Sequence, residues 1–148
     1  MIVEFPKALP FFWEAFYPRQ VADLAVFKIP GFLEGLTFSE AAMASRTYPI
    51  EYESTTAHLE EGILQLPESM RLRSAPDALT IKNPFFEFDG SYERVGDTAL
   101  KFRATFRRIE KKVPLSGYET FKADVDRIRQ FARQRVFAVQ AHEKGVRP

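Results

Sequence analysis

Cysteine is missing from this sequence and histidine is scarce, and both facts remove whole classes of function. Without cysteine the chain has no disulfide, no thiolate nucleophile and no cysteine-ligated metal. The two histidines, His58 and His142, stand far apart in the sequence, which argues against a zinc site. We therefore expect neither a metal nor another cofactor.

An excess of charge of one sign is missing too, as are long apolar runs. Lys and Arg number 21 against 20 Asp and Glu, so a net charge of +1 creates no long-range field for nucleic acid or an anionic membrane. Charges and prolines interrupt every candidate membrane span, and no basic leader precedes an apolar run at the start. We expect no nucleic-acid partner and no membrane insertion, while the compartment stays open.

Aromatic residues and prolines are abundant, with 15 Phe and 10 Pro against 7 Gly. This composition, with 45% apolar residues, predicts one folded domain over residues 1–148 with aromatic-packed sheets and rigid turns. We divide it into an aromatic N-terminal extension (1–44), a main region (45–140) and a fraying tail (141–148). The expected fold is mainly β (α+β), with antiparallel β-sandwich-like sheets and one amphipathic helix.

The region 89–140 carries the clearest structural signals. The Asp-Gly dipeptide at 89–90 predicts a tight hairpin flanked by Phe88 and Tyr92, because both central residues of that turn need positive φ. The Gly-Asp dipeptide at 96–97 predicts the next turn. A long strand over 100–107 follows, with apolar and basic residues alternating. Together these signals predict a three-stranded antiparallel meander.

A helix over 116–133 should follow the meander. Ser116 and Glu119 have the spacing of a capping box, in which each side chain satisfies a free backbone N–H of the first turn. One apolar stripe faces the sheet: Tyr118, Phe121, Val125, Ile128 and Ala132. The opposite face is charged and predicts helical ion pairs of Asp124 and Asp126 with Arg127 and Arg129.

Shorter elements are predicted on either side of the meander. Period-2 alternation or apolar runs indicate strands at 24–29, 48–53, 63–66, 70–73, 79–88 and 136–139. Pro84 interrupts the fifth of these. After the Pro-Gly turn at 30–31, we expect Phe32, Leu33, Leu36 and Phe38 to continue the sheet. The segment 39–46 is too short for a stable helix and is predicted as a loop or single helical turn.

An aromatic cluster near the N-terminus allows two interpretations. Its members fit no single period and are broken up by prolines: Phe11, Phe12, Trp13, Phe16 and Tyr17. They can plug one end of the core, or they can form an exposed patch that contacts a partner protein. We take them as the candidate protein contact.

Three polar groupings could carry chemistry, and each has a plainer explanation. His58 near Glu60 and Glu61 could form an acid–base pair, but no nucleophile or orienting group accompanies it. Glu51 and Glu53 share a predicted strand face and lie ~6–7 Å apart, within the range of glycosidase carboxylates. Alternating exposed glutamates are far commoner as solvated surface. We expect no catalytic residue in either group.

The basic stripe on the long strand is the third grouping. Lys101, Arg103 and Arg107 share its polar face, with Arg108 just beyond. A nucleic-acid surface would need exposed aromatics between the charges and a basic overall balance. Cross-strand pairing with acidic residues explains the stripe better.

Several short motifs resemble the C-terminal β-domain of bacterial transglutaminase-like proteins over about 45–140. They are RTYPI (46–50), LQLP (64–67), Ala75-Pro76, the aromatic meander, VPLSGY (113–118) with Phe121, and VFAV (136–139). In that family an exported chain carries an N-terminal β-domain, a papain-like transglutaminase core and then this domain. The resemblance implies a β-sandwich-like domain that accompanies an enzyme, and a periplasmic or exported location.

No catalytic residue carries over from that family, because its Cys, His and Asp belong to the transglutaminase core. The resemblance therefore favours a non-catalytic accessory domain that binds protein, either its own transglutaminase-like core or a second copy of the chain. A small hydrolase on a β-sheet scaffold and an apolar-ligand-binding β-domain remain as alternatives.

Overall fold

The structure is a computed structural model that describes residues 2–4, 20–21, 24–29 and 31–141. Its strands are β1 (Ile2–Glu4), β2 (Gln20–Val21), β3 (Leu24–Phe27), β4 (Ile50–Glu51), β5 (Ala57–Gln65), β6 (Met70–Ser74), β7 (Leu79–Lys82), β8 (Phe86–Val95), β9 (Ala99–Arg108), β10 (Lys112–Val113) and β11 (Val136–Gln140). The helical elements are the 3₁₀ turns η1 (Ser39–Ala41) and η2 (Leu115–Gly117) and the α-helix α2 (Tyr118–Arg133).

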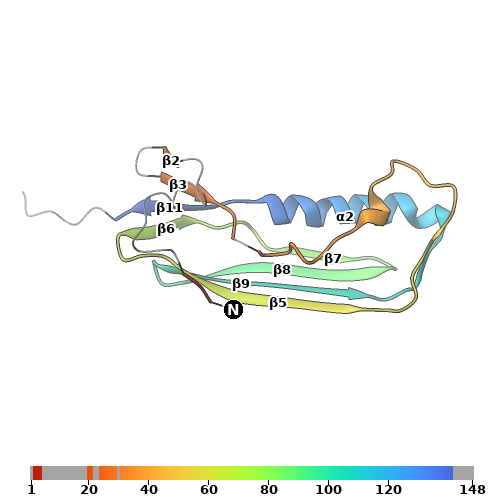
Figure 1. Cartoon of the computed structure of the whole chain (residues 1–148), viewed down its shortest axis with the longest axis horizontal. Helices are drawn as coiled ribbons and strands as arrows, with labels where there is room; N and C mark the ends of the chain where they lie inside the picture. The colour runs from red at the N-terminus through yellow and green to blue at the C-terminus, as the bar shows by residue number, and fades with distance from the viewer. Residues whose placement is uncertain (1, 5–19, 22–23, 30, 142–148) are drawn as a thin grey trace, which may run out of the picture.

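The described strands form three sheets. The largest has the order β1-β5-β9-β8-β7, and it is antiparallel except where β1 pairs in parallel with β5. A four-stranded sheet has the order β2-β3-β11-β6, and β4 pairs with β10. Figure 1 shows α2 and β11 in line with one another, forming a second layer over the five-stranded sheet. The predicted fold class, mainly β with one helix packed on antiparallel sheets, is confirmed.

The central strand β9 matches its predicted alternation. Leu100, Phe102, Ala104 and Phe106 are buried on the face below the helix, while Lys101, Arg103 and Arg107 are exposed on the other face. Because successive side chains of a strand point to opposite faces, this pattern gives the sheet one buried and one solvated side. The strands predicted at 24–29, 70–73 and 136–139 are present as β3, β6 and β11.

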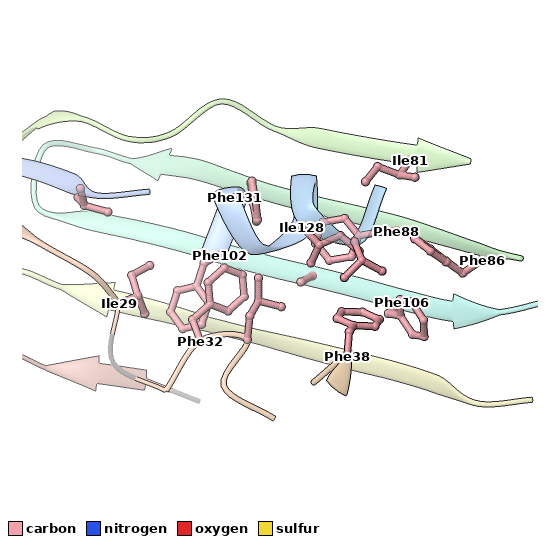
Figure 2. Close-up of a cluster of buried hydrophobic side chains, with 14 of the residues drawn as sticks. Ile29, Phe32, Phe38, Ile81, Phe86, Phe88, Phe102, Phe106, Ile128 and Phe131 are labelled. Atoms are coloured by element: carbon pink, nitrogen blue, oxygen red, sulfur yellow. The ribbon is translucent and has the colours of Figure 1, made fainter. Parts of the chain in front are cut away.

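Helix α2 covers the buried face of the sheet. It buries Tyr118, Phe121, Val125, Ile128 and Phe131, while Ala132 is only partly buried. The predicted stripe is therefore correct, with Phe131 as an addition. Figure 2 shows Phe131 and Ile128 directed from the helix toward the phenylalanines of β8 and β9.

Edge-to-face aromatic pairs hold the helix on the sheet. The ring centroids of Phe88 and Phe131 lie 5.8 Å apart, and those of Phe86 and Phe121 lie 5.6 Å apart. Both distances fall in the range that favours T-shaped contacts. The predicted helical ion pairs are present, with Asp124–Arg127 at 3.2 Å and Asp126–Arg129 at 3.1 Å.

The predicted hairpin at Asp89-Gly90 is wrong. Strand β8 runs without a break from Phe86 to Val95, and Gly90 pairs with Leu79 on one side and Ala104 on the other. Glycine is needed here for close approach, because a Cβ on Gly90 would lie 2.5 Å from Cε1 of Phe131. The dipeptide that signals a turn is thus a place where the helix comes close to the sheet.

The meander exists, but it is made of different strands. Strands β7, β8 and β9 are consecutive and antiparallel. The first turn lies at Asn83–Phe85, where the Asn83 side-chain oxygen accepts hydrogen bonds from the N–H groups of Phe85 and Phe86, each at 2.8 Å. Pro84 therefore belongs to the turn. The second turn is at Gly96-Asp97 as predicted, with Gly96 at φ +64°.

The predicted capping box does not form. Helix α2 begins at Tyr118, its N-cap residue is Gly117, and no side chain caps it. The 3₁₀ turn η2 leads into the helix instead, with backbone bonds from Gly117 N–H to Pro114 O, at 2.9 Å, and from Tyr118 N–H to Leu115 O. Ser116 and Glu119 are exposed instead.

The segment 31–39 does not continue the sheet as predicted. A turn covers 31–35, with Leu33 in the left-handed region at φ +64°, and the chain then crosses the inner face of the sheet. Phe32, Leu33 and Phe38 are buried, and the Phe32 ring lies 4.8 Å from that of Phe102. The segment lies beside α2 and packs side chains onto the sheet, as Figure 2 shows for Phe32 and Phe38. The single helical turn predicted within 39–46 is present as η1.

Candidate functional site

Exposed apolar side chains gather at one end of the domain, which we call the loop end and define as residues 43–52 and 109–115. It lies around the start of α2, on the right in Figure 1. Four of the seven large apolar side chains exposed in the described part of the chain belong to it: Met43 (60% exposed), Tyr48 (76%), Ile109 (37%) and Leu115 (49%). Exposed apolar groups that cluster in this way are typical of protein contacts.

Hydrogen bonds hold the first half of the loop end in place. Arg46 donates from Nε to the Tyr48 carbonyl oxygen at 3.1 Å and from Nη1 to the Glu40 carbonyl oxygen at 3.0 Å. Its guanidinium also lies 5.8 Å from the centroid of the Tyr118 ring. The Tyr118 hydroxyl donates to the Met43 carbonyl oxygen. The loop is therefore tied to the start of the helix at Met43 and at Arg46.

Tyr52 closes the other side of this loop. Its hydroxyl donates to Glu40 Oε1 at 2.6 Å, and the Arg108 guanidinium stacks over its ring at 3.5 Å from the centroid. Burial raises the pKa of Tyr52 above the ordinary value of 10.0, and the Glu40 carboxylate adds to this effect, while Arg108 opposes it. The backbone N–H of Tyr52 donates to Lys111 O at 2.7 Å, next to the β4–β10 pair.

A hollow of about 520 Å³ opens within the loop end. Its lining residues are Glu40, Arg46, Tyr48, Pro49, Ile50, Glu51 and Tyr52. With Glu40 included, the loop end carries three basic side chains (Arg46, Lys111, Lys112) and three acidic ones (Glu40, Glu51, Glu110). The loop end as a whole therefore has no excess charge of one sign. Its exposed tyrosine and apolar rim can instead contact apolar or aromatic groups.

His58 and Glu60 lie together near the start of strand β5. Their side chains are 3.2 Å apart, and both Glu60 oxygens accept from the Leu33 backbone N–H, at 3.1 and 3.2 Å. The pair thus holds the left-handed turn around Leu33, which explains a half-buried carboxylate without a reaction. Glu61 lies on the opposite face and pairs with Arg103 at 3.9 Å.

Glu51 and Glu53 do not share a strand face, because β4 ends at Glu51. Both are exposed, and Glu51 lies 3.5 Å from Lys112 across the β4–β10 pair. The predicted strand over 48–53 is shorter because only Ile50 and Glu51 find a partner strand. No paired-carboxylate geometry results.

Cross-strand partners account for the basic stripe on β9, as predicted. Arg107 pairs with Glu87 at 2.8 Å, and Arg103 pairs with Glu61 on the other neighbouring strand. Lys101 stands opposite Glu93 in the β8–β9 register. Arg108 leaves this face and stacks on Tyr52.

The predicted contact residues Phe11, Phe12, Trp13, Phe16 and Tyr17 lie outside the described residues, as does His142. The loop end was not among the predicted sites. Its signal in the sequence is the RTYPI motif at 46–50, which marks the family resemblance but does not reveal that Tyr48 is exposed.

Within residues 2–4, 20–21, 24–29 and 31–141, no three or more His, Asp or Glu side chains are placed to hold a metal ion. None of the helices in this described part of the chain is long and apolar enough to cross a bilayer.

Comparisons with known proteins give a family and a shared fold. The family model described as "Domain of Unknown Function with solved-structure structure (DUF3858)" matches residues 25–138. No curated protein matches the chain. The chain is similar to the crystal structure of a "putative protease" from Parabacteroides distasonis ATCC 8503, with a TM-score of 0.66 and 13% identity.

That alignment covers 93% of this chain and 26% of the Parabacteroides protein, so the chain spans about a quarter of that protein's length. At this identity the likeness shows the fold alone. Neither comparison names a transglutaminase-like protein, and that placement stays a prediction.

Proposed function

We propose that this chain, which belongs to the DUF3858 family of domains of unknown function, is a non-catalytic accessory domain that binds protein. Its partner is a transglutaminase-like enzyme domain, and the contact surface is the loop end. The observation that carries this proposal is the set of exposed apolar side chains around Tyr48, on a loop tied to the folded body.

Exposure and fixation together favour a contact surface over a solvated loop. Fully burying a side chain such as Leu or Met is worth about 1.5–3 kcal/mol, so Met43, Tyr48 and Leu115 hold binding free energy that the isolated domain does not use. The bonds of Arg46 and Tyr118 fix the loop before any partner arrives. A pre-ordered loop loses little conformational entropy on binding.

The balance of charge predicts the kind of contact. With Glu40 included, the three basic and three acidic side chains of the loop end cancel one another, so long-range attraction contributes little. The contact should therefore be mainly apolar, with aromatic Tyr48 near its centre, and its affinity should depend only weakly on salt.

A structural use for the titratable side chains supports the non-catalytic part of the proposal. Glu60 holds the Leu33 turn, and His58 in turn contacts Glu60. Glu40 accepts the Tyr52 hydroxyl. Glu60, His58 and Glu40 thus each have a structural role through a named partner.

The test is binding of the purified chain to the transglutaminase-like domain encoded in the same source genome, measured by calorimetry. The variant Tyr48→Ser with Leu115→Ser should weaken binding by at least about tenfold, since each side chain contributes roughly 1 kcal/mol or more at an apolar contact. Leu59→Ser is the matched control, because Leu59 is equally exposed (57%) but lies on the outer face of β5.

Wild-type affinity for the double variant would refute the loop end as the contact. A loss of binding in Leu59→Ser alone would move the contact to the outer sheet face. Absence of any interaction with the transglutaminase-like domain, or of such a domain from the source genome, would refute the partner.

A further inference from the structure

A second hollow lies between α2 and the segment 33–39 and shares no lining residue with the hollow of the loop end. It has a volume of about 350 Å³, and its walls are Leu33, Leu36, Thr37, Phe38, Ser39, Ile128, Arg129 and Ala132. Most of these side chains are apolar. Ile128 on the helix and Phe38 on the facing segment can be followed in Figure 2.

One wall of this groove is held in an unusual backbone conformation. Leu33 has φ +64°, in the left-handed region that residues other than glycine rarely adopt. The Glu60 carboxylate fixes it by accepting the Leu33 N–H with both oxygens, at 3.1 and 3.2 Å, and His58 supports Glu60 at 3.2 Å. Strained backbone held by surrounding groups is commonly found at ligand sites.

The groove also contains a positively charged side chain. Arg129 is the one charged residue among its lining residues. Its guanidinium donates to Phe38 O at 2.8 Å and to Asp126 Oδ1 at 3.1 Å, and Asp126 also lies 3.7 Å from Lys122. Asp126 is therefore shared between two cations, Arg129 and Lys122. The two bonds do not use all the guanidinium N–H donors.

We propose that this groove binds a small molecule with an apolar tail and a carboxylate head. The tail lies against Leu33, Leu36 and Ile128, and the carboxylate accepts from Arg129. A volume of 350 Å³ stands near the lower end of ligand sites, roughly 300–1,000 Å³, which suits one short tail. This inference does not rest on the proposed protein contact, because the two surfaces have different lining residues.

The test uses octanoate, octanol and octylamine as probes, titrated against the isotope-labelled chain and followed by NMR. Octanoate should shift the amide signals of Leu33, Leu36 and Thr37 and those of 128–132. It should bind at least about tenfold more tightly than octanol, since a hydrogen bond to a charged group is worth about one power of ten or more. Octylamine should bind more weakly still.

Two variants locate the site. Ala132→Trp fills the groove from the helix and should abolish octanoate binding, whereas Ala123→Trp, at an exposed position of the same helix, should leave it unchanged. Arg129→Gln should remove the preference for octanoate over octanol while octanol binding remains.

Several results would overturn the proposal. Among them are a lack of saturable shifts with octanoate in the wild-type chain, and equal affinities for the three probes. Unchanged octanoate binding in Ala132→Trp would do the same. If Ala132→Trp does not fold, the comparison of probes in the wild-type chain and in Arg129→Gln still decides the question.

Discussion

Replacing Gly90 by alanine tests the contact between helix and sheet at its closest point. An alanine Cβ would lie 2.5 Å from Cε1 and 2.6 Å from Cζ of Phe131, distances that real Cβ atoms do not show. The Phe131 ring is 2% exposed and packs against Phe32, Phe88 and Tyr92, with centroid distances of 5.4–6.5 Å. Because these neighbours enclose the ring, the ring, α2 or β8 must shift.

The expected cost follows from two opposing effects. Overpacking a core by a methyl group typically destabilises by about 1–3 kcal/mol, and a ring enclosed by aromatic neighbours places this site at the upper end. Replacing glycine by alanine stiffens the unfolded chain, which returns about 0.4–1 kcal/mol. We expect a net loss of about 2 kcal/mol in the free energy of unfolding, or roughly 4–8 °C in Tm for a domain of this size.

Urea unfolding followed by circular dichroism measures this loss, with Gly35→Ala as the matched control. A Cβ at Gly35 meets only His58 Cε1 at 3.8 Å, an ordinary contact, so this variant should change stability little. In the double variant Gly90→Ala with Phe131→Leu, the smaller side chain makes room for the new methyl group. The double variant should therefore lose less stability than the sum of the losses in the two single variants. Equal stability of Gly90→Ala and Gly35→Ala would show that the close contact does not exist.

Three further predictions concern other parts of the structure. Glu60→Ala should cost about 1–3 kcal/mol in urea unfolding, because the left-handed Leu33 loses its charged acceptor; a change below ~0.3 kcal/mol would contradict that role. Burial raises the pKa of Tyr92 above 10.0, so the folded state keeps a proton that the unfolded state loses, and stability should fall as pH rises above about 10. Tyr92→Phe should make this alkaline fall shallower in melting curves, and an identical profile would refute the burial effect. The purified chain should show no amidase, protease or transglutaminase activity, and turnover that disappears in His58→Ala would count against a non-catalytic domain.

The elements that could be predicted from the sequence are those fixed by local periodicity. The alternation from Leu100 to Phe106 recurs over a whole strand, and the apolar stripe from Tyr118 to Ile128 recurs over several helical turns. Both predictions are confirmed. The prediction of a hairpin at Asp89-Gly90 was wrong because it relied on a local turn signal. The glycine is required instead by a contact with Phe131, which is distant in sequence. Only the packed helix shows that glycine serves close approach at this position.

The candidate sites could be predicted less well, since they depend on contacts between distant segments. Glu60 binds the backbone of Leu33, 27 residues earlier, and Tyr118 binds Met43, 75 residues earlier. No periodicity connects such pairs. The RTYPI motif was visible in the sequence, but the exposure of Tyr48 follows from the way Arg46 ties the loop to the start of α2.

The most direct test of the proposed contact is to map amide chemical shifts of the labelled chain while the transglutaminase-like domain is added. The account predicts changes at 43–52 and 109–115, and unchanged signals on the outer face of β5, β9 and β8. The same changes should be much smaller in Tyr48→Ser. Changes confined to the outer sheet face, with the loop end unaffected at saturation, would contradict the account.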